Sequence, residues 1–220
     1  MISVVYHDDA LLVLNKPAGL LCVPGRGPDK QDCLSTRVVA QFADALVVHR
    51  LDMATSGLVL LARGKANQRL LSQAFESRRV KKRYIALVDG SMTSPPEEWQ
   101  TIELPLLADW PNRPLQKVDH AKGKPSSTRW RVADSAVLQS AAKAWGPINL
   151  TTPHTCLEVE PVTGRTHQIR LHMASLGHPI LGDALYASNS VSTATPRLML
   201  HAQSLEFTHP INGNTLFVNC

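Results

Sequence analysis

Several common patterns are missing from this sequence of 220 residues. It contains no apolar run of about 18 residues, the length that a membrane-spanning helix requires, and its amino-terminal segment does not have the pattern of a secretory signal. Its four cysteines form no Cys-x-x-Cys pair, so neither a zinc knuckle nor a disulfide framework is indicated. It also lacks repeats, low-complexity tracts and the Gly-x-Ser-x-Gly elbow of many hydrolases. We therefore expect a cytoplasmic protein with reduced thiols and no membrane partner.

The composition is that of a globular chain. Apolar residues make up 44% and charged residues 19% of the sequence, and no long linker divides it. We expect one domain over residues 1–220. The chain has 23 Lys and Arg against 18 Asp and Glu, a formal charge of +5, which favours a polyanionic partner without identifying one.

Apolar patterning predicts the elements. Short apolar runs at 2–6 and 11–14 indicate a hairpin, as do those at 197–208 and 215–218, which Asn212-Gly213 joins. A third hairpin is predicted between 116–118 and 127–132. Helical spacing occurs at 33–42, with Asp32 as the N-cap, at 65–79 and at 166–176. The apolar stripe of the second helix comprises Ala66, Leu70, Leu71, Ala74 and Phe75.

Many strands with few helices predict an α+β protein around a largely antiparallel sheet with flanking helices. Residues 139–154 are interpreted as irregular, and their role is open.

The stretch most suggestive of chemistry is His-Arg-Leu-Asp-Met-Ala-Thr-Ser-Gly at residues 49–57. Apolar runs at 45–48 and 57–62 flank it and indicate buried strands, so Asp52 is expected where a buried strand turns. A carboxylate held on such a rigid support suits a nucleophile. An Asp before Thr-Ser-Gly can equally cap backbone N–H groups in the turn, and the segment alone does not decide between the two.

The whole string resembles the signature of the RluA-type pseudouridine synthases, which isomerise uridine to pseudouridine in folded RNA. Four further segments are similar to other landmarks of that family, in the same order. They are Asn15-Lys16-Pro17-x-Gly19-Leu20, Lys82-Arg83-Tyr84, Pro161-x-Thr163-Gly164-Arg165-x-His167-Gln168-Ile169-Arg170-x-His172 and Gly177-His178-Pro179-Ile180-x-Gly182-Asp183. Val23-Pro24-Gly25-Arg26 and Asp109-Trp110-Pro111-Asn112-Arg113-Pro114 further resemble the RluA branch, whose members modify a 23S rRNA hairpin and a tRNA anticodon stem-loop.

The resemblance implies a curved, mixed-order sheet with a central RNA-binding cleft, and an isomerase that needs no cofactor and no metal. It implies that Asp52 is the catalytic residue, that Arg165 pairs with it, and that Tyr84 stacks on the uracil or acts as a base. It implies that Arg50 fills the space of the extruded base and that His49 is a hydrogen-bonding support. From the residues alone, Tyr84 could instead belong to the core and Arg50 could simply balance Asp52.

RNA contacts beyond the pocket are expected from a loop cation, a basic run and a proline-rich loop. The residues are Arg26, Lys81, Lys82, Arg83, Trp110 and Arg113. A solvated helix end for the basic run, and a packed Trp110 beside a solvated Arg113, remain open as alternatives.

Because the matching motifs begin at Asn15, we expect no additional amino-terminal RNA-binding module. We also expect a monomer, although no pattern in the sequence indicates the oligomeric state. The competing hypothesis is a non-catalytic RNA-binding or RNA-folding protein on the same fold. The exact uridine, and whether it lies in rRNA, tRNA or both, is not predicted.

Overall fold

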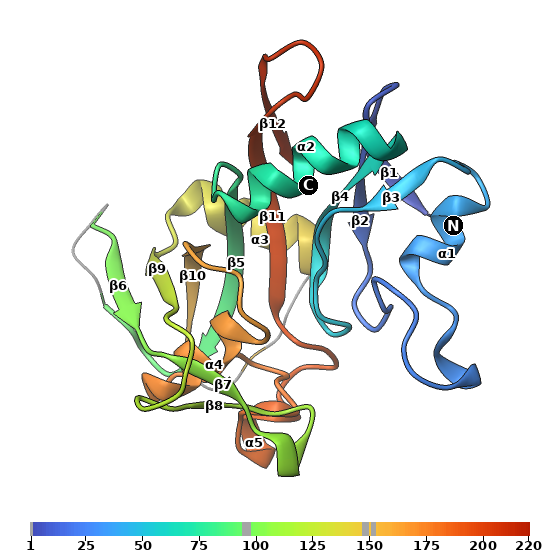
Figure 1. Ribbon diagram of the computed structural model, residues 1–220. Coiled ribbons are helices and arrows are strands. Elements are labelled where there is room, and N and C mark those ends of the chain that lie inside the picture. Colours follow the sequence, from blue (N-terminus) through green and yellow to red (C-terminus); the bar gives the residue numbers. More distant parts are fainter. Residues whose placement is uncertain (1, 94–97, 147–149, 151–152) are drawn as a thin grey trace. The chain divides into compact units, whose positions relative to one another are not determined.

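The computed structural model describes residues 2–93, 98–146, 150 and 153–220 (Figure 1). The fold is α+β with a largely antiparallel sheet and few helices, as the sequence predicts. Two compact units are distinguished: Met1–Lys82 with Ala202–Cys220, and Arg83–His201. No helix in the described ranges is long and apolar enough to cross a bilayer.

The first unit carries its strands in the order β1-β2-β4-β11, with β3 paired to β4 and β12 paired to β11. β1–β2, β2–β4, β3–β4 and β11–β12 are antiparallel, which confirms both hairpins predicted there. Its elements are β1 (Ser3–His7), β2 (Leu11–Lys16), a 3-10 turn (Pro28–Lys30), α1 (Leu34–Val39), β3 (Ala45–Val47), β4 (Ser56–Arg63), α2 (Gly64–Glu76), β11 (Leu200–Thr208) and β12 (Thr215–Asn219).

The core of this unit lies between α2 and one face of the sheet. Continuous apolar sequence makes β2 and β4 buried along nearly their whole length, as expected for strands covered on both faces. The α2 stripe is shifted from the prediction, because Leu70 is 46% exposed. The cluster comprises Leu11, Val13, Leu58, Leu60, Ala62, Leu71, Ala74, Val80, Leu205, Phe207 and Val218.

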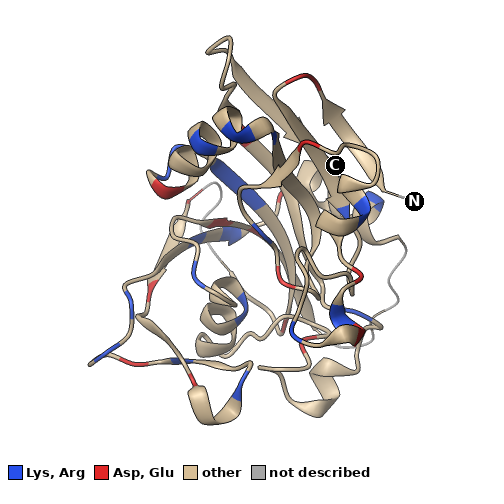
Figure 2. Cartoon of the chain, turned by 45° about the vertical axis from the view of Figure 1, so that its right-hand side comes forward, with Lys and Arg blue, Asp and Glu red and all other residues tan. Residues whose placement is uncertain are grey.

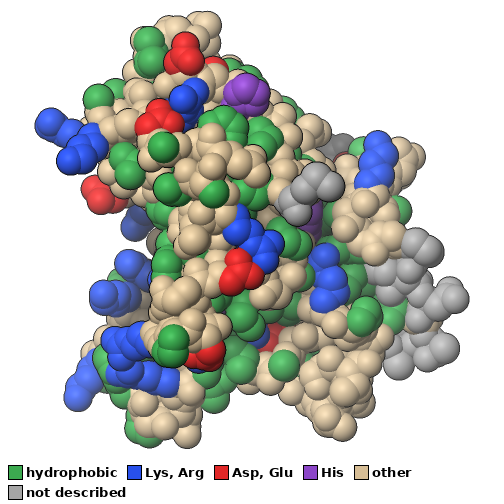
Figure 3. All heavy atoms as spheres, turned by 90° about the vertical axis from the view of Figure 1, so that its right-hand side faces the viewer, with side chains coloured by type: hydrophobic (Ala, Val, Ile, Leu, Met, Phe, Trp, Pro, Cys, Tyr) green, Lys and Arg blue, Asp and Glu red, His purple; other side chains and the backbone are tan. Residues whose placement is uncertain are grey.

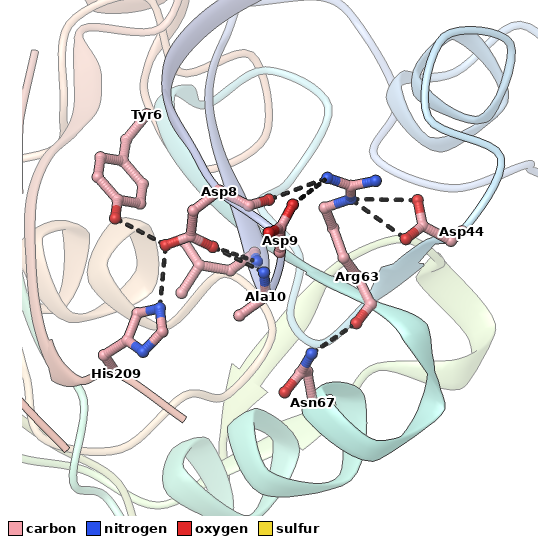
Figure 4. A network of polar contacts seen from close by, with 9 residues as sticks. Tyr6, Asp8, Asp9, Ala10, Asp44, Arg63, Asn67 and His209 are labelled. Atoms are coloured by element: carbon pink, nitrogen blue, oxygen red, sulfur yellow. Dashed lines mark hydrogen bonds and ion pairs between the residues drawn. The ribbon is translucent and has the colours of Figure 1, made fainter. Parts of the chain in front are cut away.

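A polar network locks the β1–β2 turn in place (Figure 4). The Asp8 carboxylate accepts hydrogen bonds from the hydroxyl of Tyr6 at 2.7 Å and the backbone N–H of Ala10 at 2.7 Å, and it pairs with His209 at 2.9 Å. Arg63, the last residue of β4, donates to the Asp8 carbonyl at 3.1 Å. The network therefore joins the first hairpin to the segment after β11 and to the junction between β4 and α2.

The second unit orders its main strands β5-β10-β9-β6, all antiparallel, and α4 packs against β9 and β10. Its elements are β5 (Lys81–Asp89), β6 (Gln100–Glu103), β7 (Leu106–Ala108), a 3-10 turn (Trp110–Asn112), β8 (Gln116–Val118), β9 (Ser127–Val132), α3 (Ser135–Trp145), β10 (His154–Pro161), α4 (Gln168–Ser175) and α5 (Asn189–Ser192).

Three local predictions are wrong. β8 pairs with β7 in a separate two-stranded sheet rather than with β9, because β9 is occupied by β6 and β10. Residues 135–145 form α3, whose N-cap Asp134 accepts the N–H of Val137 at 2.8 Å, where irregular chain was expected from 139. Residues 147–149 and 151–152 of that stretch lie outside the described residues. Asp32 does not cap α1; it forms a bidentate ion pair with Arg37.

Candidate active site

Asp52 lies in the loop between β3 and β4, as the flanking apolar runs predict. The carbonyl of Asp52 accepts the N–H of Thr55 at 3.2 Å, which closes a tight turn just before β4 begins at Ser56. Asp52 is half-buried, whereas Met53 is 52% exposed. The carboxylate therefore stands at the end of a fully buried strand, on a turn whose backbone is fixed.

The side chain of Lys16 joins this turn to the first hairpin by hydrogen bonds. Lys16 is fully buried at the end of β2, and its ammonium donates to the carbonyls of Pro17, Leu20 and Met53 at 2.8, 2.8 and 3.0 Å. The N–H of Gly19 also donates to the Met53 carbonyl, at 2.8 Å. A buried ammonium needs such carbonyl partners to offset its desolvation. The Asn15-Lys16-Pro17-x-Gly19-Leu20 motif thus forms the support of the loop that carries Asp52.

Gly57 brings β4 close to β11. Its φ is +111°, and a Cβ there would overlap the backbone of Ala202. A residue with a side chain cannot occupy this position without moving one of the two strands. Gly57, five positions after Asp52 in the signature, is therefore needed for β4 and β11 to pack closely in the first unit.

The buried thiol of Cys22 also contacts the loop that carries Asp52. The N–H of Leu51 donates to Sγ of Cys22 at 3.2 Å, and Cys22 is 5% exposed. Burial raises the pKa of the Cys22 thiol, which keeps it protonated at neutral pH. The residue that precedes Asp52 is therefore anchored to the loop at 22 by a neutral group.

His49 acts as a support, in agreement with its predicted role. Its Nε2 accepts the N–H of Leu60 at 2.9 Å, and its ring stacks on Phe75 with centroids 4.3 Å apart. Burial, with the nearby charge of Lys82, lowers its pKa to about 3. The ring is therefore neutral at physiological pH, with its proton on Nδ1, and it braces β4 rather than exchanging protons with a substrate.

Arg50 is exposed and makes no hydrogen bond or ion pair with any residue that the structure describes. No direct ion pair joins it to Asp52 among the described residues. Its role in the space of the extruded base stays a prediction.

Tyr84 occupies the fourth position of β5, opposite Val159 of β10, and is half-buried. Successive side chains of a strand point to opposite faces, so Tyr84 and Arg83 lie on different faces of the sheet in the second unit. The stacking role of Tyr84 and its core alternative both stay predictions.

Arg165 lies in the loop between β10 and α4, and it is exposed. Its Nε donates to the Pro125 carbonyl at 3.3 Å. Its backbone N–H donates to Oε1 of Gln168 at 3.0 Å, and Gln168 is in turn bonded to Thr163, Ser127 and Thr128. Gln168 is 3% exposed, so this buried amide fixes the backbone that presents Arg165.

A second buried network lies in the same unit. Sequence reasoning expected His167 to be a hydrogen-bonding support and assigned no role to the other members. Arg170 and Asp183 form a bidentate ion pair at 2.6 and 2.8 Å, with side chains 5% and 0% exposed. Asp183 also accepts the N–H of Tyr186, whose hydroxyl hydrogen-bonds Nδ1 of His167 at 2.8 Å. The signal was in the sequence, since all four residues follow Arg165 in the quoted motifs or directly after them.

The histidines of this region are structural. His172 is fully buried, and its two ring nitrogens contact Thr128 at 2.9 Å and Ser126 at 3.1 Å. Burial lowers its pKa, which favours the neutral ring. Across the described ranges no group of three or more His, Cys, Asp or Glu is arranged to hold a metal ion.

Lys and Arg side chains, blue in Figures 2 and 3, occur on several elements. The predicted RNA-contacting residues among them differ in their contacts. α2 ends at Glu76, and its last turn carries no basic residue. Lys81 pairs with Glu206 at 2.6 Å, while Lys82 is half-buried. Arg26 is exposed on its loop.

Arg83 is held by carboxylates, with Glu158 at 3.1 Å and Glu160 at 3.3 Å. Its guanidinium also lies over the indole of Trp99, 4.4 Å from the ring centroid. An RNA phosphate would have to compete with both carboxylates for this cation. The assignment of Arg83 to RNA binding is therefore the weakest of the set on electrostatic grounds.

The surroundings of Trp110 and Arg113 differ from those of Arg83. Trp110 is 65% exposed, which excludes the packed-Trp alternative, and Arg113 stacks on its ring at 3.2 Å from the centroid. Asp109 and Asn112 brace the loop with a side-chain hydrogen bond of 2.9 Å. The stacked pair presents an aromatic face and a cation to solvent, a combination suited to splayed RNA bases.

The candidate residues thus form two groups: His49, Arg50 and Asp52 on one loop of the first unit, and Tyr84 and Arg165 in the second. A family model described as RNA pseudouridylate synthase matches residues 10–175, three quarters of the chain and both groups. The chain belongs to the RNA pseudouridylate synthase family. The predicted fold, activity class and isomerase class are confirmed by this membership.

Individual members of the family are similar over nearly the full length. The dual-specificity RNA pseudouridine synthase RluA of Escherichia coli K12 is 45% identical over 213 residues, covering 97% of this chain and 90% of that protein. The protein of the same name from Vibrio vulnificus is 43% identical over 220 residues, covering 99% and 83%. A solved human structure, RNA Pseudouridylate Synthase Domain Containing 1, superimposes with a TM-score of 0.77 at 28% identity, covering 100% of this chain and 83% of that one.

Proposed function

We propose that this family member isomerises specific uridines in structured RNA, with Asp52 as the catalytic carboxylate. The observation that carries the assignment is the bracing of the Asp52 turn on three sides, by Lys16, by Cys22 and by β4. A catalytic group must be held to a fraction of an ångström in a productive geometry, whereas a turn that merely connects two strands needs no such support.

The reaction breaks the C1′–N1 bond of uridine and forms a C1′–C5 bond, after which C5 loses a proton and N1 gains one. Asp52 can start it by attack on C1′ or C6 or by removal of a sugar proton, and all three routes use an ionised carboxylate. We assign Arg165 to the stabilisation of that anion, because its backbone is fixed by Gln168 while its side chain is exposed. We assign Tyr84 to the uracil face and to the proton at C5.

The proposed substrates are a 23S rRNA hairpin and a tRNA anticodon stem-loop. Dual specificity is part of the name of the bacterial relatives that match most of this chain. The exposed Trp110–Arg113 pair, Arg26 and Arg50 offer stacking and phosphate contacts to such stem-loops. We further propose that the protein acts as a monomer in the cytoplasm, where both RNAs are found.

Release of tritium from C5-labelled uridine tests the activity. Total rRNA and bulk tRNA, labelled separately, are incubated with the protein and with Asp52→Asn, which keeps size and polarity. Release from both RNAs by the parent, and loss of it in the variant, supports the assignment. Release from one RNA keeps the chemistry and restricts the substrate.

A non-catalytic RNA-binding protein predicts another result. Tight binding of both RNAs by the parent protein, with no release from either, would overturn the catalytic role of Asp52. Asp44→Asn is the matched control, because Asp44 is an exposed carboxylate of the same unit that pairs with Arg63.

A further inference from the structure

A hollow of about 510 Å³ opens in the first unit beside the loop that carries Asp52. Residues 17–21 form one side of it, Met53 borders it next to Asp52, and the opposite side carries Asp29, Lys30, Asp32 and Arg37. The volume falls within the range of about 300–1,000 Å³ that is typical of small-ligand pockets. All of these residues belong to one compact unit, so the hollow does not depend on the other.

Both sides of the hollow are held by internal hydrogen bonds. The first side is fixed by the buried Lys16 ammonium, which bonds the carbonyls of Pro17, Leu20 and Met53. On the other side, the amide of Gln31 donates to the Gly27 carbonyl at 2.7 Å, and Arg37 donates to both oxygens of Asp32 at 2.6 and 2.7 Å. A site built before its ligand arrives loses less entropy on binding.

The side chains that remain available match the parts of a nucleotide. Met53 is an exposed large apolar side chain, and its thioether is suited to contact with the face of an aromatic base. Lys30 is exposed and has no ion pair or hydrogen bond to its side chain among the residues described, so its ammonium is available to a phosphate. The carboxylate of Asp29 can accept a hydrogen bond from an amino group on a base edge.

We propose that this hollow holds a nucleotide of the substrate RNA that neighbours the target uridine, with its base against Met53 and its phosphate near Lys30. The inference rests on the proposed function, because it takes Asp52 as the residue that receives the target. We infer a neighbouring nucleotide because Met53, which borders the hollow, is bonded directly to Asp52. Occupation of the hollow would then contribute to the choice of uridine.

Double-mutant cycles between the protein and the RNA test the proposal. A tRNA stem-loop with tritium at C5 of its uridines is made intact and with a single abasic nucleotide at each position near the target. Each RNA is assayed with the parent protein and with Met53→Ala. We expect Met53→Ala to lower kcat/KM on the intact RNA by about two- to twelvefold, the range of a sulfur–aromatic contact.

At one flanking position the abasic RNA should abolish the difference between parent and variant, because the contact has already been removed. If Met53→Ala and the abasic change remain additive at every position, the hollow does not hold a neighbouring base. Turnover of the intact RNA by the parent establishes the proposed function in the same experiment. A result that contradicts the subsite can therefore be told apart from a lack of enzymatic activity.

The phosphate contact has a matched control. Lys30→Ala should reduce the slope of log(kcat/KM) against log salt by about one phosphate contact, whereas Lys65→Ala, at an exposed lysine of α2, should leave it unchanged. Equal slopes for Lys30→Ala and the parent would exclude the phosphate contact. Met53→Leu keeps an apolar surface but has no sulfur, so it should recover only part of the rate that Met53→Ala loses.

Discussion

The Nζ atom of Lys16 lies 3.0 Å from the carbonyl oxygen of Met53, a residue 37 positions away in the sequence and adjacent to Asp52. The same ammonium bonds two carbonyls of the loop that follows β2. This buried charge therefore holds the loop that carries Asp52 to the first hairpin.

Lys16→Met should damage both stability and turnover. The substitution keeps the length of the side chain but leaves three carbonyls without their charged donor, which we expect to cost about 3 kcal/mol of unfolding free energy. Urea unfolding measures this, and tritium release measures turnover in the fraction that remains folded. Lys65→Met, at an exposed position of α2, is the control and should change neither. An unaltered kcat in folded Lys16→Met would show that the loop keeps its position without this residue.

Gly57→Ala should prevent β4 from packing against β11. Gly64→Ala makes a matched comparison, since both glycines have positive φ, +111° and +73°, but a Cβ at Gly64 meets nothing within 4 Å. We expect about 1 kcal/mol for Gly64→Ala from backbone conformation, and at least about 3 kcal/mol for Gly57→Ala, where overlap with Ala202 is added. Similar midpoints of urea unfolding for the two variants would contradict the close approach.

His49 should make stability depend on pH in the acidic range. Its folded pKa of about 3 lies below the unfolded value of 6.5, so as pH falls below 6.5 the unfolded state binds a proton that the folded state does not. The contribution of neutral His49 to the free energy of unfolding is therefore complete above pH 6.5 and declines as the pH falls towards 3. At pH 5.5 the loss is on the order of 1 kcal/mol for this residue.

His201, with a pKa lowered to about 4 by burial and by Arg197, adds a loss of the same sign. Unfolding free energies at pH 7.5 and 5.5 should therefore differ less in His49→Gln than in the parent, by on the order of 1 kcal/mol. His7→Gln, at an exposed histidine of β1, serves as the control. An undiminished pH dependence in His49→Gln would mean that its ring is not the neutral, buried group described here.

Tyr84→Phe separates the two roles proposed for Tyr84. The ring that stacks on the uracil is kept and the hydroxyl is removed, so RNA affinity should be retained while kcat falls by about 10²–10⁴, the usual contribution of a general base. Binding is measured by filter retention and turnover by tritium release. Tyr6→Phe, which removes a hydroxyl bonded to Asp8 in the first unit, should leave kcat unchanged. Full activity in Tyr84→Phe would leave the residue with stacking alone.

Local pattern was sufficient for much of the architecture. The continuous apolar runs of β2 and β4, the Asn-Gly turn between β11 and β12 and the position of Asp52 before β4 all follow from short-range sequence, because strand burial and turn geometry are encoded within a few residues. The family resemblance, carried by long motifs, supplied the activity class that membership confirms.

Partner choice was decided by tertiary structure. β8 pairs with β7 because both edges of β9 are taken by β6 and β10. No short-range sequence pattern indicates which strands will compete for the same edge. The supports of the site are also long-range: Lys16 reaches Met53, Cys22 accepts from Leu51, and Arg170 meets Asp183. Hydrogen bonds between residues far apart in the chain exist only once the fold has closed, so the sequence by itself determined which residues are candidates for chemistry, and the tertiary structure decided what holds them in place.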